Sequence, residues 1–384
     1  MPVRDVYVIG VGMTRLGKFP DVTLPDMARR AFYEAIKDAG VKPNEIEAAF
    51  IGHVRQGGQG AMLGQRIMRE IGVTGIPILN VENICSSGSS ALWTAFGMVS
   101  SGRFDLSVII GAEQLSILGK GVLPPRQEDL EGLLGATLPS YFAMVARRHM
   151  HEHGTTIEQL AKVSVKNHKN GSLNPYAQFQ RAVTLEEIAV SPMVADPLTV
   201  LHCCPTGDGA AAAIICSGDA VKKCRSTPIQ IAASVLKSGT YDGGWRDLTT
   251  NHQTMRAARE AYEISGIGPE DLDLIELHDC FTIAEIFHYE NLGLCKKGEG
   301  GRLIDEGQTD LSGRIPVNPS GGLLAKGHPL GATGIAQIVE IVWQLRGEAG
   351  KRQVSDARTG LAHCLGGIID GLDLGACTIH ILKR

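Results

Sequence analysis

The sequence predicts an α/β protein built from two similar halves, and two internal correspondences carry this prediction. The pattern Gly, aliphatic, x, Pro, two polar residues, aliphatic, acid occurs at 40–47 and again at 266–273, an offset of 226 residues. The small-residue segments 85–91 and 328–334 each open a helix that is followed by a strand. Halves related by a pseudo-twofold axis would face each other. The alternative is a chance similarity between two βαβ units.

The elements of the two halves follow in matching order. The first half starts with a buried strand at 5–10 and a helix at about 23–39, with Thr23 as N-cap and Pro25 in the first turn. A helix at about 252–265 takes the equivalent place in the second half. Strands are expected at 49–51 and 106–110, and again at 274–277 and 360–363. We therefore divide the chain into an N-terminal half, 1–225, and a C-terminal half, 226–384.

An insertion at about 115–200 interrupts the first half. Its prolines break the chain repeatedly, and helices are expected at 139–153 and 157–170. We expect this insertion to cover one face of the first half. Loops inserted over a rigid α/β scaffold are where substrate specificity usually lies.

Composition excludes several classes of function. The net charge of -4 provides no basic field for nucleic acid or an anionic membrane surface. No uncharged apolar run reaches the roughly 18–20 residues that span a bilayer, and the first residues lack the apolar core of a signal peptide. The nine cysteines include no Cys-x-x-Cys pair, so neither a disulfide framework nor a structural zinc site is expected. We expect a cytoplasmic protein.

Cys85 is the strongest candidate for chemistry. It stands where a loop becomes a helix and is followed by Ser-Ser-Gly-Ser-Ser-Ala. Backbone N–H groups and the dipole at a helix start favour a thiolate and can form an oxyanion hole, and small neighbours admit a bulky acyl chain. An inert buried cysteine in a small-residue turn is the alternative.

Three further segments carry reactive side chains. The glycine-rich stretch 318–334 surrounds His328, which could deprotonate a nucleophile or donate to a thioester oxygen. Segment 276–285, at the end of an apolar strand, contains His278, Asp279 and Cys280. Segment 361–367 ends another strand with Cys364 and two glycines. Each segment alone could equally be core packing.

Together these four segments resemble the thiolase family over nearly the whole chain. Thiolases have a nucleophilic cysteine at a helix start, a Gly-His-Pro motif and a late Cys-x-Gly motif, which look like Cys85, 327–329 and 364–366 here. The sequence 278–281, His-Asp-Cys-Phe, and the opening 10–17 are similar to the sterol-carrier-protein-type and archaeal acetyl-CoA C-acyltransferase branch. The resemblance implies a five-layered α-β-α-β-α fold.

The same resemblance implies a function and a set of roles. The expected reaction is CoA-dependent cleavage, or the reverse Claisen condensation, of a 3-oxoacyl-CoA through an acyl-enzyme on Cys85. His328 with His278 would hold an enolate oxygen, and Cys280 or Cys364 would transfer protons, with Cys280 slightly favoured. The remaining expected site residues are the N–H group of Gly366 at the acyl oxygen, and Gly327 and Ser320 at the substrate. CoA is then a substrate, and no metal or other cofactor is expected.

Two other segments carry weaker signals. Cys203 and Cys204 read as a strand-end turn before 205–209, which resembles a thiolase segment flanking the pocket. The run 57–60 resembles the thiolase loop that reaches a neighbouring subunit, and it could also be a surface turn.

The resemblance also bears on the partners of the protein and on competing functions. The resemblance implies a homodimer or homotetramer that binds acyl-CoA and CoA. One alternative is a ketosynthase-like condensing enzyme, which the thiols at Cys280 and Cys364 disfavour. The other is a subunit that is active only with a small zinc-finger/OB-fold partner. The sequence leaves open the acyl chain, aliphatic or aromatic, and the direction of flux.

Overall fold

The computed structural model describes residues 4–55, 60–118, 130–241, 247–370 and 373–384. Most of run 57–60 therefore lies outside the described residues. The main sheet has nine strands in the order β3-β2-β4-β7-β1-β8-β11-β10-β9. Strands β1 and β8 join its two parts through two residue pairs, Tyr7–Gln230 and Val8–Ile229. The first part consists of β1 (Val6–Met13), β2 (Ala48–Gly52), β3 (Ile78–Val81), β4 (Leu106–Gln114) and β7 (Asp208–Ser217), and the second of β8 (Ile229–Lys237), β9 (Leu274–Glu276), β10 (Thr359–Asp370) and β11 (Asp373–Lys383).

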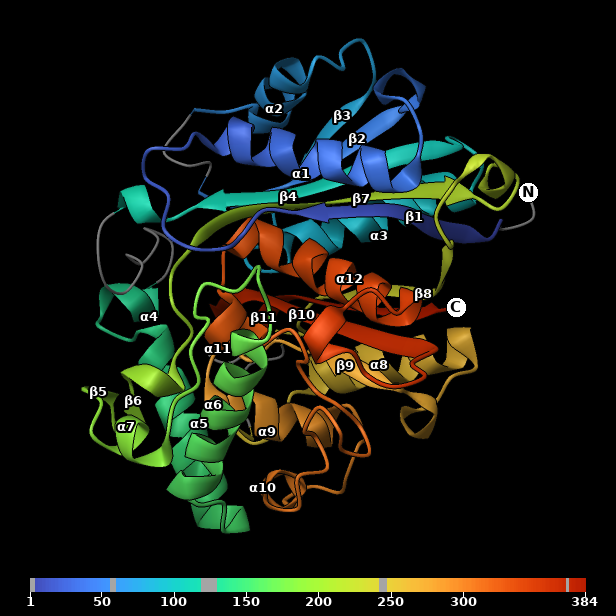
Figure 1. Ribbon diagram of the computed structural model, residues 1–384. Helices are drawn as coiled ribbons and strands as arrows, with labels where there is room; N and C mark the ends of the chain where they lie inside the picture. Colours follow the sequence, from blue (N-terminus) through green and yellow to red (C-terminus); the bar gives the residue numbers. More distant parts are fainter. Residues whose placement is uncertain (1–3, 56–59, 119–129, 242–246, 371–372) are drawn as a thin grey trace.

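Helices cover and separate the two parts of the sheet (Figure 1). Helix α1 (Leu24–Ala39) packs on β1 and β7, with α2 (Leu63–Ile71) beside it. Helices α3 (Ser87–Ser100) and α12 (Leu330–Arg346) lie in the middle, where α12 contacts both β4 and β10. Helices α8 (His252–Ser265) and α9 (Thr282–Asn291) cover the far side. The predicted five-layered α-β-α-β-α arrangement is confirmed.

The repeat at 40–47 and 266–273 has a common structure. Helices α1 and α8 end at Gly40 and Gly266, which have φ angles of 71° and 67°. Glycine is favoured at these helix ends because the left-handed conformation is strained for residues with a Cβ. In each copy a 3-10 turn beginning with a proline follows, and a strand, β2 or β9, comes next. The predicted N-cap is also confirmed, since the Thr23 hydroxyl accepts a hydrogen bond from the N–H of Asp26.

The insertion lies between β4 and β7, but its packing differs from the expectation. It contains the predicted helices, now α5 (Leu138–His153) and α6 (Ile157–Ser172), together with α4 (Leu130–Leu133), α7 (Leu185–Ala189) and the hairpin β5 (Met193–Ala195) and β6 (Leu198–Thr199). Helix α6 packs on α9, α10 (Gly300–Asp305) and α11 (Gly322–Lys326), all from the second half. The expectation that the insertion covers the first half was wrong, because α6 carries buried polar side chains whose partners lie in the second half.

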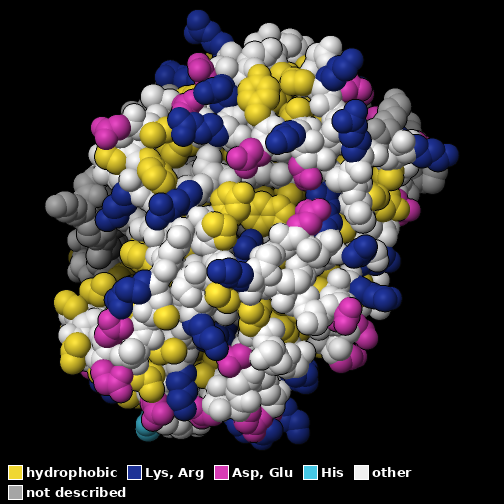
Figure 2. Space-filling view, in the orientation of Figure 1, with side chains coloured by type: hydrophobic (Ala, Val, Ile, Leu, Met, Phe, Trp, Pro, Cys, Tyr) yellow, Lys and Arg dark blue, Asp and Glu magenta, His cyan; other side chains and the backbone are white. Residues whose placement is uncertain are grey.

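The described part of the chain contains no helix that combines the length and apolarity needed to cross a bilayer. On the face shown in Figure 2, charged side chains alternate with small apolar groups, and apolar side chains gather over the β5–β6 hairpin at the lower left.

The two central helices meet through glycines. A Cβ at Gly88 of α3 would lie 2.5 Å from the carbonyl oxygen of Gly331 in α12, and one at Gly334 would lie 2.5 Å from the Cβ of Ser89. Gly52 at the end of β2 leaves no more room, because its Cβ would lie 2.5 Å from the Cα of Gly88. Backbone therefore touches backbone at the start of both helices, and the segments before these starts, which hold Cys85 and His328, are brought together.

We expect Gly88→Ala to lower the free energy of unfolding by about 1–3 kcal/mol, because the new methyl group overlaps backbone that has no room to move. Urea denaturation at matched protein concentration measures the change. Gly97→Ala is the control in the same helix, since its Cβ would meet open space, and alanine is the better helix former by about 1 kcal/mol. Equal stability of the two variants would contradict the proposed contact.

Candidate active site

Cys85 lies on a strained turn between β3 and α3. Ile84 before it has a φ of 47°, an unusual conformation for a β-branched residue. The turn is held by the backbone N–H and the hydroxyl of Ser87, which both donate to the carbonyl of Ile84 at 3.0 and 2.6 Å. The side chain of Asn83 adds a bond to the Ser90 hydroxyl at 2.9 Å. Cys85 thus precedes the N-cap Ser86 and is 8% exposed. Strain of this kind persists where the surrounding structure fixes one side chain.

His328 lies on the turn between α11 and α12. Gly327 before it has a φ of 107°, and its Cβ would lie 2.8 Å from the side-chain oxygen of Gln178. The ring Nδ1 of His328 lies 2.8 Å from the Thr333 hydroxyl, which itself donates to the carbonyl of Pro329 at 3.0 Å. Because that hydroxyl has a single proton, we infer that Nδ1–H of His328 donates to it. The lone pair is then on Nε2, as a general base requires.

The segment after β9 brings His278 and Cys280 to the same place. The backbone N–H of Cys204 donates to the carbonyl of Cys280 at 2.9 Å. Asp279 points away from the site and accepts the N–H groups of Leu323 and Leu324 at 2.7 and 3.4 Å. Since these two residues belong to α11, one carboxylate fixes the strand end that carries His278 to the helix that leads into His328.

Cys364 reaches the cluster from β10. Its thiol donates to the carbonyl of Cys85 at 3.2 Å, and its sulfur lies 3.7 Å from Nδ1 of His278. The residue is completely buried, whereas Cys280 is 9% exposed. Gly366, two residues further along β10, is in contact with the nucleophile turn, since a Cβ there would lie 2.1 Å from the carbonyl oxygen of Asn83.

These elements converge on one point. The sulfur of Cys85 and a ring nitrogen each of His278 and His328 all lie within 4.8 Å of one another. The two rings meet edge to face, with centroids 5.2 Å apart. The predicted meeting of the helix-start sulfur and the glycine-flanked imidazole is therefore confirmed as geometry. Ser320 is different: it is fully buried, and its hydroxyl donates to Glu276 at 2.6 Å.

Burial sets the protonation of the cluster. It lowers the pKa of His278 to about 3. Burial, aided by His278 and Lys326, also holds the pKa of His328 well below its usual value. Both imidazoles are therefore neutral at pH 7, when they can accept a proton or donate a neutral hydrogen bond. Burial raises the pKa of the Cys280 and Cys364 thiols well above the usual value, so both are protonated in the resting site.

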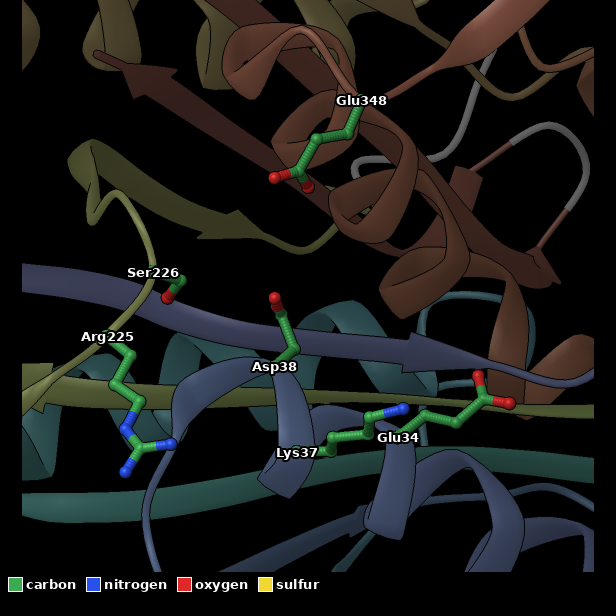
Figure 3. Close-up of a pocket in the computed structure, with 6 residues that line it drawn as sticks. All are labelled: Glu34, Lys37, Asp38, Arg225, Ser226 and Glu348. Carbon is green, nitrogen blue, oxygen red and sulfur yellow. The ribbon is translucent and has the colours of Figure 1, made fainter.

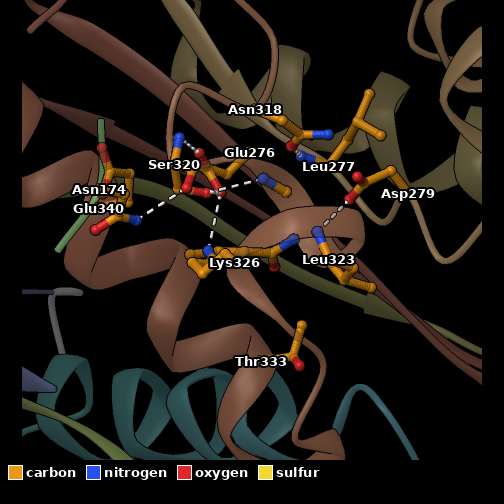
Figure 4. A network of polar contacts seen from close by, with 12 residues as sticks. Asn174, Glu276, Leu277, Asp279, Asn318, Ser320, Leu323, Lys326, Thr333 and Glu340 are labelled. Atoms are coloured by element: carbon orange, nitrogen blue, oxygen red, sulfur yellow. Dashed lines mark hydrogen bonds and ion pairs between the residues drawn. The ribbon is translucent and has the colours of Figure 1, made fainter. Parts of the chain in front are cut away.

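A buried polar network supports the site from behind (Figure 4). Lys326 and Glu276, both with fully buried side chains, form an ion pair at 3.1 Å. The carboxylate of Glu276 also accepts the backbone N–H and the hydroxyl of Ser320. Asn167 of α6 donates to Asp279 and to Glu285. The network ties β9, the 318–322 turn, α11 and the insertion into one unit.

Sequence reasoning missed two contributors. Cys204, interpreted as part of a strand-end turn, is half-buried beside Cys280, and its proximity to Cys85, after burial, raises the pKa of its thiol. The only signal was its position just before 205–209. Thr333, whose hydroxyl lies 2.8 Å from Nδ1 of His328, is one of many small residues in the stretch 318–334, and only the fold reveals its partner.

A separate cleft of about 520 Å³ does not belong to this site (Figure 3). It is lined by Glu34, Lys37, Asp38, Arg225, Ser226 and Glu348. Glu348 follows the C-terminal end of α12, whose 17 residues span about 25 Å from the end that follows His328. The lining contains no cysteine or histidine and mixes both signs of charge.

The fold and the cysteine–histidine cluster are typical of acyltransferases, in which an imidazole can activate a thiol. The comparisons with known proteins identify the family. Residues 6–219 match the family model described as "Thiolase, N-terminal domain", and residues 239–376 match "Thiolase C-terminal domain-like". The chain belongs to the thiolase family and is a thiolase-type acyl-CoA acyltransferase.

Individual relatives extend over most of the chain. It is similar to "Acetyl-CoA acetyltransferase" of Methanothermobacter thermautotrophicus, with 45% identity over 390 residues and 100% of both chains covered. It is 40% identical to "Benzoylsuccinyl-CoA thiolase subunit BbsB" of Thauera aromatica, covering 95% of each. It is 41% identical to "Sterol carrier protein 2" of Homo sapiens, over 95% of this chain and 70% of that protein.

Solved structures agree on the fold. A chain described as "Ltp2-ChsH2(DUF35) aldolase" superposes with a TM-score of 0.86 at 25% identity, covering 100% of this chain and 98% of the other. Human mitochondrial 3-ketoacyl-CoA thiolase superposes with a TM-score of 0.72 at 20% identity over 100% of both chains, which supports the fold alone.

We expect Thr333→Val to lower kcat by at least about tenfold, because the His328 ring loses the acceptor that fixes its tautomer and orientation. Thr333→Ser, which keeps the hydroxyl, is the matched control and should retain most of the activity. Steady-state kinetics measures the loss of kcat, and circular dichroism shows whether the variant is still folded. Full activity in the valine variant would exclude this role for Thr333.

Proposed function

We propose that this enzyme cleaves a short 3-oxoacyl-CoA with CoA, or forms it by the reverse condensation, with acetoacetyl-CoA as the first substrate to test. The observation that carries the proposal is the convergence of Cys85, His278 and His328 within 4.8 Å. The archaeal relative that is 45% identical over the whole chain supports the acetyl group.

In the proposed first half-reaction, Cys85 attacks the 3-oxo carbonyl and His328 accepts the thiol proton on Nε2. Breaking the bond between the α-carbon and that carbonyl leaves an acyl-Cys85 and the enolate of the shortened thioester. His328 and His278 donate to the enolate oxygen, and a thiol protonates the α-carbon. In the second half-reaction CoA gives its proton to the same, now deprotonated, thiol, and its sulfur attacks the acyl-cysteine. The Cys85 thiolate released in this step takes its proton back from His328.

We assign the proton-transferring thiol to Cys280. This assignment is supported by exposure, because Cys280 is 9% exposed and lies beside the half-buried Cys204. Cys364 is fully buried and donates to the carbonyl of Cys85. We propose that Cys364 steadies the nucleophile turn, and that the N–H groups of Cys85 and Gly366 hold the oxygen of the acyl-enzyme. The close contact between Gly366 and Asn83 supports this last role.

Thiolysis of acetoacetyl-CoA and of longer, branched and aryl 3-oxoacyl-CoA thioesters by the purified chain tests the function. We expect Cys85→Ala to abolish acyl-enzyme formation, and His328→Ala to lower turnover by at least about a hundredfold. Cys280→Ala should lose turnover while Cys85 still becomes acylated. Cys364→Ala should keep a larger share of the activity.

Mass spectrometry of trapped acyl-enzyme separates the outcomes of this panel. Full turnover of Cys280→Ala together with inactive Cys364→Ala would reverse the assignment of the thiols. An acyl group found on Cys85→Ala would end the proposal of Cys85 as nucleophile.

We propose that the two halves meet near residues 225–226. We also propose that the protein works in the reducing cytoplasm, where its nine unbridged cysteines are stable.

Two relatives suggest a partner. One is called a subunit, and the solved structure of the other pairs Ltp2 with ChsH2(DUF35). We propose that a small zinc-finger/OB-fold subunit binds this chain as well.

We propose in addition that two copies of the chain pair through β3. This strand stands at an edge of the sheet, and an open edge is a template for pairing. Trp93 of the adjacent α3 is 42% exposed. We expect the purified chain to sediment at twice its sequence mass, and Trp93→Glu to shift it to the monomer. Met255→Glu, at a similarly exposed position on α8, is the control. A monomeric wild-type chain would contradict the homodimer.

A further inference from the structure

We propose that Cys85, His278 and His328 form a binding site for a thiophilic divalent cation such as Zn²⁺, and that the bound ion reversibly inhibits the enzyme. The three donor atoms already lie within 4.8 Å of one another. In a tetrahedral zinc site the metal lies about 2.3 Å from sulfur and about 2.0–2.1 Å from nitrogen, so neighbouring ligand atoms are roughly 3.5 Å apart. Side-chain movements of about 1 Å would close the cluster around an ion.

The surroundings of His328 are those of a typical metal ligand. Its Nδ1 lies 2.8 Å from the Thr333 hydroxyl, which fixes the ring and leaves the lone pair on Nε2. His278 is held beside it, since the two rings meet edge to face with centroids 5.2 Å apart.

The charges around the cluster tolerate an added cation. Lys326 is a buried cation that acts on His328, and its ion pair with Glu276 offsets part of its charge. The thiolate of Cys85 cancels one positive charge of the ion. One sulfur and two nitrogens select Zn²⁺ or Co²⁺ over Mg²⁺ and Ca²⁺, which prefer oxygen.

An ion at this position excludes the substrate. An ion bound to the sulfur of Cys85 occupies the position that the carbonyl carbon of an acyl thioester must reach. The metal would also occupy the lone pairs of both histidines. Inhibition should therefore be competitive with acyl-CoA and reversed by a chelator. This kinetic consequence rests on Cys85 being the nucleophile, whereas metal binding itself does not.

Co²⁺ is the probe, because a cobalt–thiolate bond gives a charge-transfer band in the near ultraviolet. Chelator-treated protein should bind one Co²⁺ with this band, Cys85→Ala should lose the band, and His278→Ala should bind at least about tenfold more weakly. Cys224→Ala, at a half-buried cysteine on another part of the chain, is the thiol control. A competing group, the buried His149 and Glu290 with the neighbouring His153, offers only nitrogen and oxygen and would give no thiolate band.

A second measurement needs no variant. Zn²⁺ should slow the alkylation of Cys85 by iodoacetamide at least tenfold, EDTA should restore the rate, and Mg²⁺ should have no effect. Absence of the cobalt band, a band that survives in Cys85→Ala, or an unchanged alkylation rate would each overturn the proposal. None of these measurements needs turnover. The proposal of metal binding can therefore be refuted without affecting the proposed acyltransferase reaction, and the proposed reaction can be refuted without affecting metal binding.

Discussion

The structure depends on the close contact of two helix starts. Gly88 and Gly331 let α3 and α12 meet backbone to backbone, and Gly52 lets β2 approach the same point. Two backbones gain dispersion energy at such short range only where no side chain lies between them. Each glycine also lowers stability, because it adds conformational entropy to the unfolded chain. This cost is incurred where the two halves of the chain are in contact. Both reactive turns come immediately before the helices so placed.

Rigidity behind the site comes from polar groups that are fully buried. An ion pair such as Lys326–Glu276 contributes little net stability, because desolvation offsets the attraction, but removing one partner typically costs about 3–5 kcal/mol. Its value here is geometric, since Glu276 holds the turn at Ser320 and Asp279 holds the start of α11. Asn167 carries the same network into the insertion. A change of sequence in the insertion can therefore alter the site without touching the substrate.

Local signals were enough to predict the two ends of α1 and the repeat, whereas the five-layered arrangement was predicted from the resemblance to thiolases. Thr23 and Gly40 delimit α1 by chemistry that acts within one turn of helix, and the matching Gly266 revealed the repeat. The cluster of Cys85 and His328 followed from the repeat, because equivalent helices must face each other. The side on which the insertion lies did not follow, since it is decided by pairings such as Lys166–Glu285 that are more than a hundred residues apart in the chain. The roles of Thr333 and Cys204 were not predicted for the same reason. Each role depends on a contact with a distant or buried partner, and such contacts are known only once the chain is folded.

The chemistry of the cluster explains why metal binding and acyl transfer belong to the same three side chains. A general base must be neutral with its lone pair aimed at the sulfur, and burial together with the Thr333 hydroxyl provides that state for His328. A soft metal ligand needs the same neutrality and the same free lone pair. Protonating the rings would suppress the metal, but it would also remove the base. Only the geometry remains as a means of discrimination. The donors lie within 4.8 Å of one another, which leaves room for a carbonyl carbon and its oxygen, whereas an ion must draw the donors closer together. The strained turn at Ile84 and the packed glycines resist that movement, so the rigidity that arranges the nucleophile also limits the affinity for the inhibitor.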